Sequence, residues 1–335
     1  MTGQGLGLVR KPALRYANQS FGPARVAFLE SLIQNILNAL QWGSFYSLIA
    51  LGYCLVYGVL SLINFAHGDI FMAGAYFAFF GATFLLGKTG VIPPGMPGWA
   101  VLALTIPISM ILTSALGVTL ERVAYRPLRR KGAHKLYVVI TALMCGLVLE
   151  NGNLALFGAS RKNFPTLVPQ IVYSLGGVSV TNLKVAVILV AVLSFLFLHY
   201  VVGKTKIGMA MQAISYDRFA VPLMGIPTDT VIVFTFVLGS SFAALAGVLF
   251  AMSYPVLDPF MGALIGWKAF IAAVVGGIGS IRGAFAGGFL LGFVEIMVVA
   301  FFPSTFRDLI AFSILLLILS LKPTGLFGVA RRTKI

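Results

Sequence analysis

Long, nearly uninterrupted apolar runs are the feature that most constrains how this chain can fold. Most of them reach about 20 residues, the length that an α-helix needs to cross a bilayer. Lipid offers the backbone no hydrogen-bond partner, whereas a helix satisfies its own N–H and C=O groups. The runs do not alternate every second residue, which excludes a transmembrane barrel. We therefore predict an all-α polytopic membrane protein with about eight hydrophobic segments, at residues 32–62, 69–87, 98–120, 136–157, 183–202, 230–252, 265–300 and 305–321.

The few charged residues are concentrated between these runs. Only 10% of the 335 residues are charged, against about 25% in a soluble domain. The net charge is +15, but its clustering in short segments is typical of the cytoplasmic loops of membrane proteins and argues against nucleic-acid binding. Both termini are therefore predicted to be cytoplasmic. The main clusters are Arg10, Lys11, Arg15 and Arg25 before the first run, Arg122, Arg126, Arg129, Arg130, Lys131 and Lys135 in the first basic loop, and Lys322, Arg331, Arg332 and Lys334 at the end.

The sequence predicts one membrane domain with short extensions. Residues 1–30 are predicted to be a cytoplasmic extension without a cleavable signal, because they lack a continuous apolar region. The alternative for Val26 to Leu40 is an amphipathic helix on the membrane surface. The membrane domain is predicted over 31–328 and a basic tail over 329–335. Between the runs, 91–98 is predicted to be a rigid loop, and the alternating stretch that follows 158–170 suggests a small hairpin.

In two glycine-rich regions, the number of predicted membrane crossings conflicts with the sides on which the basic segments are predicted to lie. Three runs separate the basic N-terminal tail from the basic loop at 121–135, and an odd number of crossings cannot begin and end on one side. The run at 265–300 must likewise cross twice or re-enter. Non-helical backbone at membrane depth persists where protein or a water-filled cavity shields it. We therefore predict broken or re-entrant helices near 62–77 and 274–292; the alternative is that these glycines only allow close helix packing.

Polar residues inside apolar runs are candidates for the substrate pathway or its gate, because they are costly in lipid. Asn64, His67 and Asp69 cluster in the first glycine-rich region, and Glu295 lies within the second run of this kind. The alternative for Asn64 and Asp69 is capping of a helix end. The alternative for Glu295 is pairing with a base such as Lys268.

No catalytic or metal-binding set can be assembled from the three histidines and nine acidic residues. The two GKT triplets, at 87–89 and 203–205, lack the preceding glycine of an ATP-binding loop. Cys54 and Cys145 lie inside apolar runs and are predicted to be small buried side chains. The chain is therefore predicted to be no enzyme, to hold no cofactor or metal, and to leave any ATP to another subunit.

The segment 203–229 is the most informative one outside the apolar runs. It is mildly amphipathic and basic, and it carries small or polar groups at helical spacing. Small side chains allow the groove of another protein to approach a short helix closely, which predicts an ATPase-coupling element; an ordinary loop helix is the alternative. The residues concerned are Ala210, Ala213, Asp217, Ala220 and Gly225.

Four ordered sequence blocks give this chain a family resemblance. They are GSFYSLIALGYCLVYGVLSLINFAHGDIFMAGAY (43–76), ERVAYRPLRR (121–130), VLDPFMGALIGWKAFIAAVVGGIGSIRGAFAGGFLLGFVE (256–295) and KPTGLFG (322–328). Together with the segment 203–229, they resemble the permease subunits of branched-chain amino acid ABC importers. The resemblance covers about residues 31 to 328. Arg282 departs from it, standing where the family usually has proline.

The resemblance implies the partners and the cargo. Expected partners are a second, homologous permease, two cytoplasmic ATPases that bind ATP, and a periplasmic binding protein that delivers leucine, isoleucine or valine. The chain is then expected to be a multi-pass protein of the bacterial inner membrane. Urea or a short amide is the alternative cargo, since urea permeases share these blocks. A stand-alone channel or secondary carrier is the alternative of another class, for which a coupling segment would have no purpose.

Overall fold

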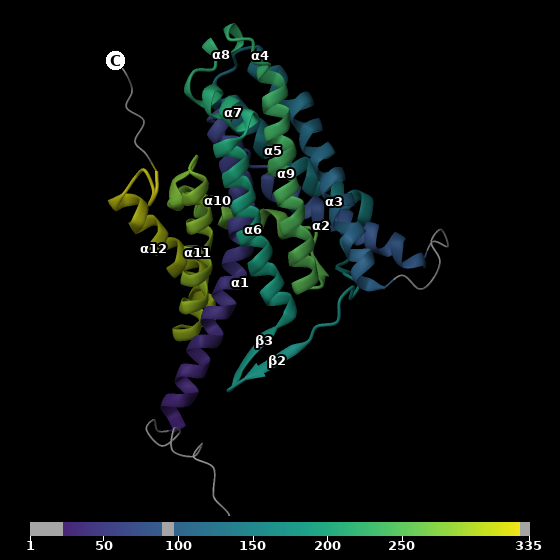
Figure 1. The fold of residues 1–335 in the computed structure, drawn as a ribbon, viewed down its shortest axis with the longest axis vertical. Helices are drawn as coiled ribbons and strands as arrows, with labels where there is room; N and C mark the ends of the chain where they lie inside the picture. Colours follow the sequence, from purple (N-terminus) through teal and green to yellow (C-terminus); the bar gives the residue numbers. More distant parts are fainter. Residues whose placement is uncertain (1–22, 89–96, 329–335) are drawn as a thin grey trace, which may run out of the picture.

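The computed structural model describes residues 23–88 and 97–328 as one bundle of helices (Figure 1). Eight helices within these residues are long and apolar enough to span a membrane, and the shorter α10 adds a ninth apolar helix. The predicted all-α polytopic architecture is confirmed. The helices are α1 (Pro23–Leu60), α2 (His67–Thr83), α3 (Gly98–Leu120), α4 (Arg126–Arg130), α5 (Lys135–Phe157), α6 (Asn182–Lys204), α7 (Lys206–Tyr216), α8 (Ala220–Leu223), α9 (Thr228–Ser253), α10 (Met261–Gly277), α11 (Ile281–Phe301) and α12 (Arg307–Leu321).

Four short strands lie at one end of the bundle. Strands β2 (Val172–Leu175) and β3 (Val178–Thr181) form the hairpin that the alternating sequence predicted. Their two-residue turn uses Gly176 and Gly177, both with positive φ, as tight hairpins require. Strand β1 (Lys162–Asn163) pairs with β4 (Val256–Leu257). We call this end of the bundle the hairpin face and the opposite end, formed by 121–135 and 203–227, the basic face.

The first helix connects the two faces. With 38 residues, α1 is about 57 Å long, well beyond the roughly 30 Å of a bilayer core. Its first half lies beside the hairpin: the amide of Ser179 donates to Gln34 Oε1 at 2.9 Å, and Lys184 Nζ donates to Asn38 Oδ1 at 2.7 Å. Figure 1 shows it projecting past the other helices on that face.

This placement corrects the predicted start of the chain. The described C-terminal segment lies at the basic face, where the amide of Leu326 donates to the carbonyl of Val275 at 2.8 Å. Helix α1 starts at the other face, so the prediction that the first span and the C-terminus lie on one side is wrong. The proposed surface helix over Val26–Leu40 is also wrong, because these residues continue into α1. Residues 1–22, most of the loop at 91–98 and the tail at 329–335 lie outside the described residues.

Both glycine-rich regions are interrupted helices, as predicted. After α1 ends, the chain turns back at 61–66 and α2 starts inside the bundle, where His67 is 1% exposed. Helices α10 and α11 are separated by residues 278–280. Gly277, the last residue of α10 (φ 113°), and Gly279 (φ 92°) adopt a backbone conformation that L side chains rarely adopt. Since α1 starts at the hairpin face, the three helices α1, α2 and α3 lead from that face to the basic face. The odd number of crossings before residue 121 is therefore consistent with the structure.

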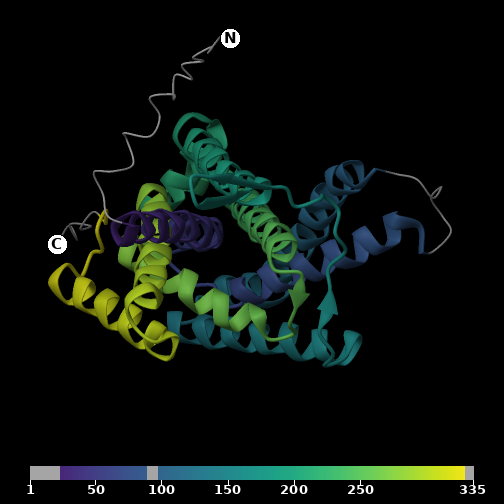
Figure 2. The same ribbon diagram turned by 90° about the horizontal axis from the view of Figure 1, so that it is seen from below.

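The centre of the bundle is packed through small residues. Helix α9 contacts α1, α2 and α3. A Cβ added at Gly247 would lie 2.7 Å from the carbonyl oxygen of Phe71, and one at Gly239 would lie 3.5 Å from that of Gly52. Small residues of α9 therefore allow its neighbours to pack closely against it. Seen from below, α12 lies at one edge of this packed centre and α2 and α3 extend to the other (Figure 2).

Candidate functional site

A pocket of about 320 Å³ lies between α2, α5 and α10, next to the first helix interruption. The pocket lies beside the middle of α5, because Gly146, the central residue of that 23-residue helix, is part of its wall. Two acidic side chains, several glycines and a set of apolar side chains form its wall. The lining residues are Tyr53, Phe65, Gly68, Asp69, Leu143, Met144, Gly146, Leu147, Glu150, Gly262, Ala263, Gly266 and Trp267.

Asp69 is the predicted pathway residue that the structure places in this pocket. It lies in the first turn of α2 and is 6% exposed. Its Oδ1 atom has no hydrogen-bond partner among the described residues. A Cβ added at Gly146 would lie 2.6 Å from Asp69 Oδ2, and one at Gly262 would lie 2.7 Å from Oδ1. Glycine at both positions therefore leaves room at the carboxylate that any other residue would fill.

Close backbone contact between α2 and α10 positions the carboxylate. A Cβ on Gly266 would lie 2.6 Å from the Cα of Gly68, so only glycine allows the two helices to meet here. Both helices begin beside the pocket, and neither N-cap residue, Ala66 nor Phe260, makes a side-chain capping hydrogen bond. The partial positive charge of a helix N-terminus is thus present on two sides of the pocket.

Asn64 and His67 belong to the same interruption, but their side chains make contacts elsewhere. Asn64 Oδ1 accepts a hydrogen bond of 2.7 Å from the Tyr125 hydroxyl, which links the turn at 61–66 to the helical turn Glu121–Tyr125 between α3 and α4. The His67 ring lies edge-on to Tyr53, with centroids 4.7 Å apart, and packs against Gly52 of α1. Neither residue is part of the pocket wall, and their part in a gate stays a prediction.

Glu295 lies in a separate buried ion-pair cluster. Its Oε1 atom is 2.8 Å from Lys268 Nζ, and its Oε2 atom accepts a hydrogen bond of 2.8 Å from the Tyr46 hydroxyl. Lys268 also contacts Asp308 at 2.6 Å, and Arg307 lies 3.7 Å from Glu295. The alternative that paired Glu295 with Lys268 thus matches the structure. The cluster joins α1, α10, α11 and the start of α12.

The coupling segment 203–229 forms α7 and α8 at the basic face. Ala210 and Ala213 are half-buried against the bundle, and Ala220 is half-buried at the start of α8. Asp217 Oδ1 accepts from the amides of Phe219 and Ala220, at 2.9 and 3.0 Å, and so shapes the turn between the two helices. Gly225 has φ 76° in the turn that follows α8. Of the five predicted residues, the three alanines are thus half-buried, and Asp217 and Gly225 are exposed at turns.

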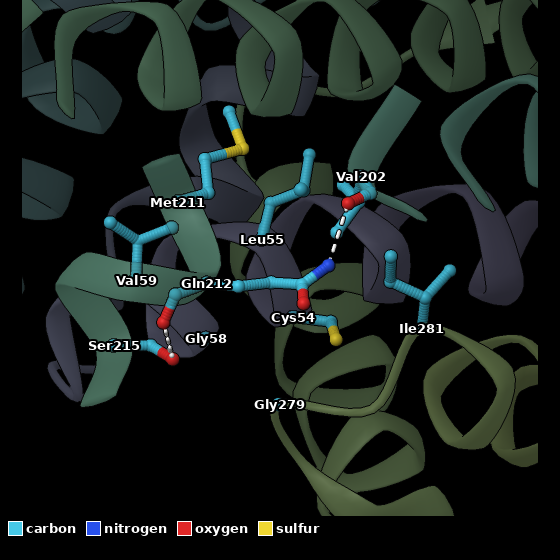
Figure 3. Close-up of a pocket in the computed structure, with 10 residues that line it drawn as sticks. All are labelled: Cys54, Leu55, Gly58, Val59, Val202, Met211, Gln212, Ser215, Gly279 and Ile281. Carbon is cyan, nitrogen blue, oxygen red and sulfur yellow. Dashed lines mark hydrogen bonds between the residues drawn. The ribbon is translucent and has the colours of Figure 1, made fainter. Parts of the chain in front are cut away.

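A small cavity connects α7 to both α1 and the second helix interruption (Figure 3). It measures about 90 Å³. Gln212 of α7 reaches across it and donates a hydrogen bond of 2.7 Å to the carbonyl of Val202. Cys54 and Gly58 of α1 and Gly279 form the other side. The cavity therefore lies between α7, α1 and the turn that joins α10 to α11.

Comparison with known proteins identifies the family. The family described as the permease component of branched-chain amino acid transport systems matches residues 35–319. The high-affinity branched-chain amino acid permease protein BraD of Pseudomonas aeruginosa is 40% identical over 300 residues, which cover 88% of this chain and 95% of that protein. The chain belongs to this permease family.

Two further relatives support the assignment to the permease family. The corresponding permease protein LivH of Escherichia coli is 36% identical over 302 residues, covering 88% of this chain and 95% of that protein. A probable LivH permease of Methanocaldococcus jannaschii is 26% identical over 305 residues, covering 87% of this chain and 91% of that protein. No solved structure matches the chain. The resemblance predicted from the four sequence blocks is confirmed.

Membership of an importer permease family makes the exposed surface of α7 and α8 informative, since such a permease works in a complex with other subunits. Four large apolar side chains at this tip are almost fully exposed: Tyr216 (86%), Phe219 (89%), Leu223 (89%) and Met224 (75%). The tip lies between the candidate spans α6 and α9, and exposed apolar side chains clustered in this way are typical of interaction sites. The spacing of small residues, on which the predicted coupling element rested, does not reveal these four side chains. Their position in a basic segment outside the apolar runs was the available signal.

Proposed function

We propose that this chain is a membrane-spanning permease subunit of an ATP-binding cassette importer for branched-chain amino acids. The observation that carries the proposal is the 36–40% identity, over 88% of the chain, to permease proteins named for high-affinity branched-chain amino acid transport. The fold supports it, because a broken helix next to a pocket at mid-depth is a common arrangement at the binding region of transporters.

The basic face is proposed to be cytoplasmic. The basic loops at 121–135 and 203–227 favour that side, and the exposed apolar tip of α7 and α8 is a fitting surface for an ATPase subunit. Two ATPases would bind ATP there, so that this chain needs no cofactor of its own. A second, homologous permease would complete the pathway. The chain would be a multi-pass protein of the inner membrane.

The hairpin face is then periplasmic, where a substrate-binding protein would deliver its ligand. The projecting start of α1 and the β2–β3 hairpin are the most prominent features there (Figure 1). Asp258, which is near β4, forms an ion pair of 3.1 Å with Arg161 and thereby ties the two loops of this face together. This firm surface suits docking of a protein that must align with the pathway.

Uptake by reconstituted complexes tests the proposal. The chain is purified with its neighbouring permease, ATPases and binding protein, placed in proteoliposomes, and supplied with labelled leucine or labelled urea, with and without ATP. We expect uptake of leucine that requires ATP. Uptake of urea alone would overturn the proposed substrate, and equal uptake without ATP would overturn the proposed importer class.

The docking surface is tested by a pair of matched substitutions. Tyr216→Ser removes an exposed aromatic ring from the tip of α7, whereas Tyr173→Ser removes one that is 54% exposed on the hairpin. We expect only the first variant to lose its ATPase subunits during purification, because only that ring lies on the basic face. Equal retention of the ATPases by both variants would contradict docking at this tip.

A further inference from the structure

We propose that the pocket between α2, α5 and α10 binds the charged head group of an amino acid on its way through the permease, with Asp69 as the partner of the ammonium group. This assignment rests on the proposed transport function and adds a site to it. The side chain of Asp69, the charge of the pocket wall, the helix N-termini beside it and its apolar part each support the assignment.

The first support is an acidic group that lacks a partner. Asp69 is 6% exposed, yet its Oδ1 atom has no hydrogen-bond partner among the described residues. A buried carboxylate without a counter-charge is costly, and in a membrane segment it marks a functional site. Glu121 also has an oxygen without a hydrogen-bond partner, but the other two buried acids of the described residues each contact a cation: Glu121 contacts Arg129 at 2.8 Å, and Glu295 contacts Lys268 at the same distance. The unpartnered carboxylate therefore points to a cationic ligand.

The second support is the charge of the whole pocket wall. The wall contains a second acid, Glu150, on α5, and none of the described lining residues is lysine or arginine. An ammonium group entering here meets two acidic side chains and no basic one. An anion without a positive group would be repelled, so the pocket selects a ligand that carries a cation.

The helix N-termini supply the site for the opposite charge of a zwitterion. Helices α2 and α10 both begin beside the pocket without a side-chain cap. First-turn N–H groups and the helix dipole bind carboxylates. Gly262 lies in the first turn of α10 and close to Asp69, since a Cβ at that position would lie 2.7 Å from Oδ1. An α-amino acid has its ammonium and carboxylate on one carbon, and in this pocket the acidic side chain of Asp69 lies beside the start of α10.

The remaining wall suits an aliphatic side chain. Leu143, Met144 and Leu147 of α5 line the pocket together with Phe65 and Trp267. The volume of about 320 Å³ falls at the lower end of the roughly 300–1,000 Å³ of small-ligand pockets. Urea can donate hydrogen bonds to Asp69, but it has neither a positive charge for the carboxylate nor an aliphatic part for this wall, so the pocket favours an amino acid over urea.

A methyl-group substitution tests the site with an internal control. Gly146→Ala places a Cβ 2.6 Å from Asp69 Oδ2, whereas Gly152→Ala, on the same helix, places one where nothing lies within 4 Å. Both changes replace glycine by alanine in α5 and have the same effect on helix propensity. We expect Gly146→Ala to raise the KM for leucine at least about tenfold, a loss typical of a broken hydrogen bond to a charged group. Gly152→Ala should leave the KM unchanged.

Direct binding identifies the chemical group that Asp69 recognises. Saturation-transfer NMR is suited to weak ligands and is carried out on the complex in nanodiscs, without binding protein. Leucine and isoamylamine keep the ammonium group, whereas 4-methylpentanoate lacks it. We expect saturation transfer to the first two ligands and none to the third. Asp69→Asn should weaken the binding of leucine at least about tenfold while the complex still assembles, as judged by its elution volume.

Two outcomes separate this site from the proposed function. If the wild type transports leucine and both Asp69→Asn and Gly146→Ala do so with unchanged KM, the assignment of the pocket is wrong and the importer function stands. If the wild type transports no leucine, the proposed function is wrong. Stronger saturation transfer to 4-methylpentanoate than to leucine would overturn recognition of the ammonium group.

Discussion

Asp69 and Glu295 are both acidic side chains buried in the helical bundle, and their surroundings differ. Glu295 is 1% exposed and has Lys268, Tyr46 and Arg307 around it. Asp69 is 6% exposed and lines a pocket with one oxygen atom unpartnered. From the sequence alone, both were candidates for the pathway.

The difference shows how a buried charge can serve either stability or binding. Charges that neutralise each other within the protein hold helices together, and their electrostatic attraction contributes to the stability of the fold. A charge that faces a cavity without a counter-charge can instead attract a ligand of opposite charge. Removing partners should therefore destabilise the Glu295 cluster, whereas removing the charge of Asp69 should cost function and no stability.

The largest effect is expected in the Glu295 cluster. Lys268→Met leaves Glu295 buried without its closest counter-charge, since Arg307 remains only at 3.7 Å. Loss of one partner from a buried pair costs about 3 kcal/mol of unfolding free energy. We expect this loss in detergent-based unfolding of the purified chain, together with weaker association of α12, which the cluster joins to α10 and α11.

The double variant Lys268→Met/Glu295→Gln is the control for this prediction. It removes both members of the pair, so no buried charge is left without a partner, and Asp308 is half exposed to solvent. Most of the lost stability should return. A double variant as unstable as Lys268→Met would show that Lys268 acts through packing and not through its charge.

The charge of Asp69 should have the opposite effect on stability. Asp69→Asn keeps the shape of the side chain and removes an unpaired buried charge, which is unfavourable in a membrane protein. We expect an increase of about 1–2 kcal/mol in unfolding free energy, measured in the same way as for Lys268→Met. A decrease would contradict the comparison and would favour the alternative in which Asp69 stabilises the start of α2.

Much of the architecture could be predicted from the sequence because local patterns determine it. Apolar length fixed the spans, and glycine-rich stretches marked both interruptions, since only glycine allows contacts such as that of Gly68 with Gly266. The alternation around Gly176 and Gly177 marked the hairpin. By contrast, nothing local distinguishes Asp69 from Glu295. Their difference depends on residues such as Gly146 and Lys268, which are far away in the sequence.

The side from which α1 starts was predicted wrongly for an identifiable reason. Basic residues before the first run favoured the face that carries the other basic loops, but the charge rule is a bias that packing can override. Here the contacts of Gln34 and Asn38 with the hairpin region hold the start of α1 at the opposite face. The odd number of runs before residue 121 had a second solution, a start on the other side, and the structure adopts it.

The smallest effect is expected at Asn64, which lies in the same interruption as Asp69 but faces the helical turn between α3 and α4. Tyr125→Phe removes the hydroxyl that donates to Asn64 Oδ1 at 2.7 Å and leaves that buried oxygen without its donor. The expected loss of unfolding free energy is about 1 kcal/mol, with an unchanged KM for leucine, because neither residue lines the pocket. A raised KM with unchanged stability would place Asn64 in the pathway beside Asp69. The distinction between Asn64 as a structural residue and Asp69 as a binding residue would then be wrong.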